Sequence, residues 1–82
     1  MISKEAILHY VKPVFPDADV TLIDKTGTMD HYQICIVSQK FQDMNRLDRQ
    51  RLVYETLSEP MKDGRIHALE IQSRTPEEAF NQ

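Results

Sequence analysis

The segment HYQICIVS, residues 31–38, alternates cleanly between two faces and therefore decides the fold. One face carries Tyr32, Ile34 and Ile36, and the other carries Gln33, Cys35 and Val37. This period of two predicts a strand with one buried face. The segment VTLI, residues 20–23, predicts a second, shorter strand just before it. We expect the two strands to pair as an antiparallel hairpin.

The segment DKTGT, residues 24–28, separates the two predicted strands. Its composition is typical of a turn or an exposed loop. Gly27 is the residue expected to adopt a positive φ, because glycine has no Cβ to oppose it.

Capping residues predict a helix before the hairpin and another after it. Ser3 is expected to cap a first helix, which Pro13 and Pro16 end. Asn45 is expected to cap a second helix, with Asp48 three residues further on. The apolar stripe predicted for this second helix consists of Leu47, Val53, Tyr54, Leu57 and Met61.

Proline and glycine predict where the second helix ends. Pro60 and Gly64 are expected to close it, and residues 66–71 to form a third strand. Thr75 and Pro76 predict the start of a last short helix. The order is α-β-β-α-β-α, an α+β fold with a three-stranded sheet.

Length and composition limit the class of protein. The 82 residues are expected to form one domain, residues 1–82. A net charge of −3 does not suit nucleic-acid binding through overall charge, although a local basic face is compatible with it. No apolar stretch is long enough to span a membrane, and the first residues do not resemble a signal peptide. Cys35 has no second cysteine to pair with, so we expect a cytoplasmic protein.

A basic segment at the start of the second helix is the first candidate site. Arg46, Arg49 and Arg51 lie in its first two turns, where the helix dipole disfavours cations. An anionic partner would explain them. A solvated face is equally compatible with the pattern, since Asp48 offsets part of the repulsion.

Histidine and cysteine supply the remaining candidates. His9, His31 and His67 stand in no zinc-ligand spacing. The pattern alone favours His67 as a partly buried structural histidine at the start of the third strand, and His31 as an exposed strand end. Cys35 is expected to be an inert buried thiol. No catalytic motif is present, and we expect no enzymatic activity.

Several segments resemble the BolA family, and within it the short IbaG-like members. They are HYQI at 31–34, IVS at 36–38, KF at 40–41, NRLDRQRLVY at 45–54, RIHAL at 65–69 and TPEE at 75–78. The resemblance covers most of the chain, and the first thirty residues agree in layout. It implies a fold similar to a class II KH domain, with helices packed on one side of a three-stranded mixed sheet.

The resemblance also implies a function. Members of the family bind monothiol glutaredoxins and share a bridging [2Fe-2S] cluster with them. The family's histidine ligand corresponds to His67. Its second ligand, histidine or cysteine, lies in the loop that here spans residues 24–30 and contains neither. Thr28 stands about where the cysteine would be, and His31 borders the loop as a substitute.

Two functions follow from the resemblance. The first is a non-catalytic adaptor that binds a monothiol glutaredoxin with its glutathione and takes part in [2Fe-2S] cluster handling. Its interface would combine the Gly27 loop, His67 and the start of the helix at residues 46–51. The alternative is a DNA-binding transcriptional regulator of the stress or morphology response. In that case Arg46, Arg49 and Arg51, with Lys40, would contact phosphates weakly and in a salt-sensitive manner.

Overall fold

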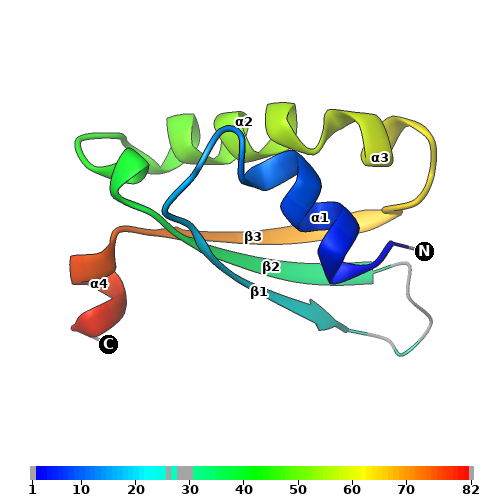
Figure 1. The fold of residues 1–82 in the computed structure, drawn as a ribbon, viewed down its shortest axis with the longest axis horizontal. Coiled ribbons are helices and arrows are strands. Elements are labelled where there is room, and N and C mark those ends of the chain that lie inside the picture. Colours follow the sequence, from blue (N-terminus) through cyan, green and yellow to red (C-terminus); the bar gives the residue numbers. More distant parts are fainter. Residues whose placement is uncertain (1, 26, 28–30, 82) are drawn as a thin grey trace.

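Three helices cover one face of a three-stranded sheet, and a fourth lies beyond the end of the last strand (Figure 1). The structure is a computed structural model that describes residues 2–25, 27 and 31–81. Its elements are α1 (Lys4–Val11), β1 (Asp19–Asp24), β2 (His31–Val37), the 3₁₀ turn η1 (Gln39–Phe41), α2 (Arg46–Thr56), α3 (Ser58–Lys62), β3 (Ala68–Arg74) and α4 (Pro76–Phe80). The α+β class is confirmed. No helix in these described parts of the chain is long and apolar enough to cross a membrane.

Strand β2 is the centre of the sheet, whose order is β1-β2-β3. It pairs antiparallel with β1, from Asp19 opposite Val37 to Asp24 opposite Tyr32. It pairs parallel with β3, from His31 beside Ala68 to Val37 beside Arg74. The predicted hairpin and the mixed sheet are both confirmed.

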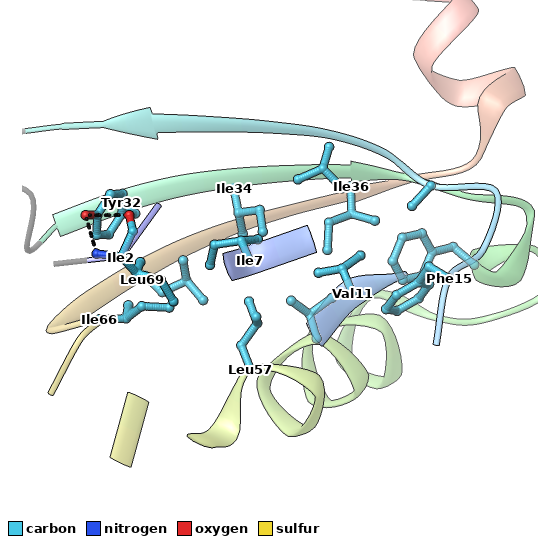
Figure 2. Close-up of a cluster of buried hydrophobic side chains, with 14 residues drawn as sticks. Ile2, Ile7, Val11, Phe15, Tyr32, Ile34, Ile36, Leu57, Ile66 and Leu69 are labelled. Atoms are coloured by element: carbon cyan, nitrogen blue, oxygen red, sulfur yellow. Dashed lines mark hydrogen bonds between the residues drawn. The ribbon is translucent and has the colours of Figure 1, made fainter. Parts of the chain in front are cut away.

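The core lies between the sheet and helices α1 to α3 (Figure 2). Strand β2 contributes Tyr32, Ile34 and Ile36 to it, the three residues that the alternation places on one face. The largest fully buried side chains from other segments are Ile7, Val11, Phe15, Phe41, Val53, Leu57 and Ile66. Burial of this apolar surface is the main stabilising contribution to the fold.

The start of the chain is fixed to the middle of the sheet. The Tyr32 hydroxyl accepts a hydrogen bond from the Ile2 N–H at 3.2 Å and donates one to the Ile2 carbonyl at 3.3 Å (Figure 2). The Ser3 hydroxyl accepts from the Ala6 N–H at 3.1 Å, which confirms the predicted N-cap. The two bonds between Ile2 and Tyr32 hold the start of α1 against β2, which its apolar side chains cover.

The predicted second helix is in fact two helices. Instead of running on to Met61, α2 ends at Thr56, and α3 begins at Ser58. Pro60 explains the break. It has no N–H to donate to the Thr56 carbonyl, and its ring clashes with that same carbonyl. Pro60 is buried within α3, so it interrupts the helical segment earlier than expected and does not close it.

The predicted apolar stripe is only partly correct. Val53 and Leu57 are fully buried, and Met61 packs against the core. Leu47 and Tyr54 remain 57% and 42% exposed, respectively. They lie seven residues apart on one side of α2, and the Tyr54 hydroxyl reaches the Leu69 carbonyl at the edge of the sheet at 3.4 Å.

Two leucines allow a matched test of the core. Leu57→Ala removes a fully buried side chain and should lower the free energy of unfolding by about 2–5 kcal/mol. Leu47→Ala, at an exposed position ten residues earlier, should change it by no more than about 0.5 kcal/mol. Urea unfolding followed by circular dichroism measures both. Equal losses in the two variants would contradict the packing described here.

Candidate functional site

Two histidines lie at the same end of the sheet. His31 is the first residue of β2, and His67 directly precedes β3. Because β2 and β3 are parallel, both strands start at this end, and His31 is the register partner of Ala68. Neighbouring strands are about 4.8 Å apart, so the two histidine backbones are close neighbours.

Both imidazoles are accessible to solvent. His31 is an exposed strand end, as predicted. The prediction that His67 is partly buried within the strand is wrong, because β3 begins one residue later and His67 is exposed in a bend. The buried residue of this bend is Ile66. Among the described residues, no side chain donates a hydrogen bond to His67 or accepts one from it.

Between β1 and β2 the structure describes Lys25 and Gly27. Gly27 adopts φ +75°, as predicted, and its N–H donates to the Asp24 carboxylate at 3.0 Å. The Lys25 N–H donates to the His31 carbonyl at 2.9 Å, and its ammonium lies 3.4 Å from the Glu70 carboxylate. Thr28, the remaining loop candidate, lies outside the described residues.

The only cysteine lies away from this end. Cys35 is half-buried on the sheet face opposite the helices, not fully buried as expected, and its register partner is Gln72. Gln72 lies five positions after His67, roughly 16 Å along the strand. Within the part of the chain that the structure describes, no three acidic, histidine or cysteine side chains group closely enough to hold a metal ion.

The basic residues of α2 lie at the opposite end of the sheet. Arg49 contacts the carbonyl of Ser73, near the end of β3, whereas His67 precedes its start. The length of β3 therefore separates them, about 20 Å. The predicted interface of the Gly27 loop, His67 and the start of α2 does not form one surface, because α2 runs back along β3.

Arg49 is a structural residue that ties α2 to α4. Its guanidinium donates to both carboxylate oxygens of Glu78, at 2.7 and 3.3 Å. It also donates to the carbonyls of Met44 at 3.0 Å and Ser73 at 3.2 Å, and it lies over the Phe41 ring. With all these contacts made, only 14% of the side chain is exposed.

The other basic candidates divide into engaged and unengaged side chains. The Lys40 ammonium donates to the Val14 carbonyl at 3.1 Å and lies over the Phe15 ring. Arg46 and Arg51 have no hydrogen bond or ion pair to any described residue and are exposed. The Arg74 side chain at the end of β3 likewise has no hydrogen bond or ion pair to a described residue. Nothing in the sequence singles out Arg74, because its neighbours are polar and match an ordinary solvated strand face.

Comparison with known proteins gives the family. The model of the BolA-like protein family matches residues 6–78 of the chain. The chain belongs to the BolA family. The prediction made from its segments is thereby confirmed, and the IHAL and TPEE segments both lie within the matched region.

Individual BolA relatives agree with this assignment. Acid stress protein IbaG of Escherichia coli is 40% identical over 53 residues, which cover 65% of this chain and 63% of IbaG. BolA-like protein 1 of Mus musculus is 46% identical over 50 residues, which cover 61% of this chain but only 36% of the mouse protein. The solved structure of BolA1 from Arabidopsis thaliana has a TM-score of 0.82 at 30% identity, covering 94% of this chain and 98% of that one.

The Arg49–Glu78 pair of this BolA chain predicts a pH dependence. Hydrogen bonds from Arg49, and then from the Thr75 N–H, lower the pKa of Glu78 from 4.5 to about 2. Ionised Glu78 therefore stabilises the fold above pH 4.5, and this contribution is lost as the pH falls toward 2. Glu78→Gln should flatten the dependence of the free energy of unfolding on pH across this range.

Urea unfolding at several pH values between 6 and 2 measures this effect. Glu77→Gln is the matched control, because this neighbouring carboxylate has no partner among the described residues. An unchanged pH dependence in Glu78→Gln, or an equal change in both variants, would contradict the role of the pair.

Proposed function

We propose that this BolA chain is a non-catalytic adaptor that binds a monothiol glutaredoxin and shares a [2Fe-2S] cluster with it. The proposal applies to this chain what the sequence resemblance implies for the family. The observation that carries it is the position of His67: exposed, next to the start of β3, and without an intramolecular hydrogen-bond partner among the described residues. A metal ligand needs such an uncommitted imidazole nitrogen.

The donor set fits a cluster that two proteins hold together. His67 offers an imidazole, and His31 at the start of the neighbouring strand offers a second. Cys35 is too far along the sheet to join them, as its register partner Gln72 shows. The thiolates would come from the glutaredoxin cysteine and its glutathione.

The second ligand distinguishes this chain from the family pattern. Residues 24–30 contain neither histidine nor cysteine, so His31 is the imidazole nearest to that loop in the sequence. When bound, the cluster supplies a redox centre whose potential is higher with imidazole than with all-cysteine ligation. His67 and His31 would hold and orient it from this side.

Two basic side chains flank the histidines, and each is paired with a carboxylate, Lys25 with Glu70 at 3.4 Å and Arg65 with Asp63 at 2.9 Å. Lys25 lies beside His31, and Arg65 precedes His67 by two residues. Arg65 is held over the Tyr10 ring and hydrogen-bonded to Asp63, which fixes its position. The arginines of α2 are at the far end and do not contribute to this surface.

Co-reconstitution tests the proposal. The chain is mixed with a monothiol glutaredoxin, iron, sulfide and glutathione, and visible circular dichroism is recorded for wild type, His67→Ala and His31→Ala. His9→Ala is the matched control, since His9 is an exposed histidine on α1. We expect a spectrum distinct from that of the glutaredoxin homodimer, unchanged in His9→Ala and lost in His67→Ala.

The remaining outcomes separate the parts of the proposal. Loss of the spectrum in His31→Ala identifies His31 as the second ligand, and its retention places that ligand elsewhere. Titration calorimetry without iron and sulfide measures protein contact alone. If the spectrum of the mixture never differs from that of the glutaredoxin homodimer, the cluster role is overturned. If calorimetry also shows no heat of binding between the two proteins, the adaptor role is overturned too.

A further inference from the structure

The two edges of the sheet differ in what covers them. At the β3 edge, Arg49 donates to the Ser73 carbonyl at 3.2 Å, and the Tyr54 hydroxyl donates to the Leu69 carbonyl at 3.4 Å. Helix α2 therefore occupies acceptors that an added strand would need. Strand β1 forms the other edge, and no helix lies along its outer side (Figure 1).

Backbone groups in the middle of β1 point to this outer edge. The Lys25 N–H donates to the His31 carbonyl at 2.9 Å, so the backbone of Lys25 faces β2. Because these groups alternate along an antiparallel strand, the N–H and carbonyl groups of Val20 and Leu22 face away from β2. No described side chain is hydrogen-bonded to either residue. An edge of this kind is a template for another strand.

The side chains on the open face of β1 carry opposite charges at the two ends of the strand. This face, away from the helices, presents the exposed residues Asp19, Thr21 and Ile23, because the alternate residue Val20 is buried in the core. Lys25 continues the same face. A segment with an acid at one end and a base at the other is complementary to its own antiparallel copy.

We propose that β1 pairs antiparallel with β1 of a second copy of this chain, with the two-fold axis at Leu22. Leu22 then lies opposite Leu22 of the second copy, and their outward N–H and carbonyl groups bond to each other. Asp19 lies opposite Lys25 of the second copy, and Thr21 lies opposite its Ile23. The two-fold axis makes each of these contacts twice. The pairing joins two three-stranded sheets into one.

The charges favour this pairing over the contact that Lys25 makes within the chain. Lys25 lies 3.4 Å from Glu70, but the two side chains are 46% and 65% exposed, and such pairs contribute little to stability. Reaching Glu70 also requires Lys25 to span two strand spacings, about 10 Å. Asp19 of the second copy would be on the adjacent strand, with its Cβ about 5 Å from that of Lys25.

The apolar side chain on this face gains a neighbour as well. Ile23 is 48% exposed in the single chain. In the dimer it packs beside Thr21 of the second copy, and pairs of β-branched side chains suit adjacent strands. Strand pairing therefore covers an apolar side chain that the fold leaves in water.

Neighbouring registers lose the charge match. Centred on Thr21, the pairing sets Asp19 opposite Ile23, a charge against an apolar side chain. Centred on Ile23, it sets Lys25 opposite Thr21. Of these three registers, only the one centred on Leu22 places Asp19 and Lys25 opposite each other, so charge reversal tests both the dimer and its register.

Sedimentation equilibrium of the full chain alone, from about 10 µM to about 1 mM at low salt, tests the proposal. We expect the apparent mass to rise from 9.6 kDa toward twice that value. Amide NMR over the same range should show concentration-dependent shifts centred on Val20 and Leu22. Exchange of the Leu22 amide hydrogen with solvent should slow as the dimer forms.

Charge reversal provides the matched variants. Asp19→Lys and Lys25→Asp each set like charges opposite one another twice, and each should weaken the dimer about tenfold. The double variant restores opposite charges and should recover most of the affinity. Glu77→Lys is the control, because it makes the same charge change as Asp19→Lys at an exposed site on α4. It should leave the dimer unchanged.

Several results would overturn the proposal. One is an apparent mass that stays at 9.6 kDa throughout the range, and another is a dimer whose NMR shifts lie on α2 and β3. Equal weakening by Glu77→Lys, or no recovery in the double variant, would likewise exclude this pairing. A monomer whose Leu22 amide shifts only when glutaredoxin is added would assign the edge to that partner instead. The measurements on the chain alone leave the co-reconstitution test unaffected.

Discussion

Parallel strands cannot be joined by a tight turn, so the pairing of β2 with β3 requires a connection that crosses the sheet. Residues 38–67 form this connection and contain η1, α2 and α3. The connection covers one face of the sheet and buries Val53 and Leu57 against it (Figure 1). It also brings the starts of both strands to one end and their last residues to the other. The histidines and the arginines at the start of α2 are at opposite ends for this reason.

Helix α2 has a second role at the edge of the sheet. Its Arg49 and Tyr54 side chains donate to outward carbonyls of β3, which has no strand on its other side. Unpaired edges invite association with other chains, and occupied carbonyls reduce that tendency. Arg49 therefore acts within the fold, while Arg46 on the same helix remains unengaged. Position in the fold, and not residue type, separates a hydrogen-bonded structural arginine from an exposed one.

Much of the fold was predictable, because the signals are local. The alternation of residues 31–38, the caps at Ser3, Asn45 and Thr75, and the positive φ of Gly27 are all present in the structure. Each depends on bonds or steric limits within a few residues. The break between α2 and α3 also has a local cause, because Pro60 has no N–H to donate to the Thr56 carbonyl. The prediction from the sequence nevertheless placed the end of this helix too late.

The candidate site was less predictable. The sequence by itself identified the histidines and the basic helix, because residue type and spacing suffice to name candidates. It also determined that Tyr32, Ile34 and Ile36 share one face of β2, because side chains of a strand alternate with a period of two. Only the tertiary structure decided that His67 is exposed, that Arg49 is engaged with Glu78, and that the two candidate surfaces lie at opposite ends. These properties depend on contacts between residues far apart in the chain, such as those 29 positions apart in the Arg49–Glu78 pair, and no local pattern specifies such contacts.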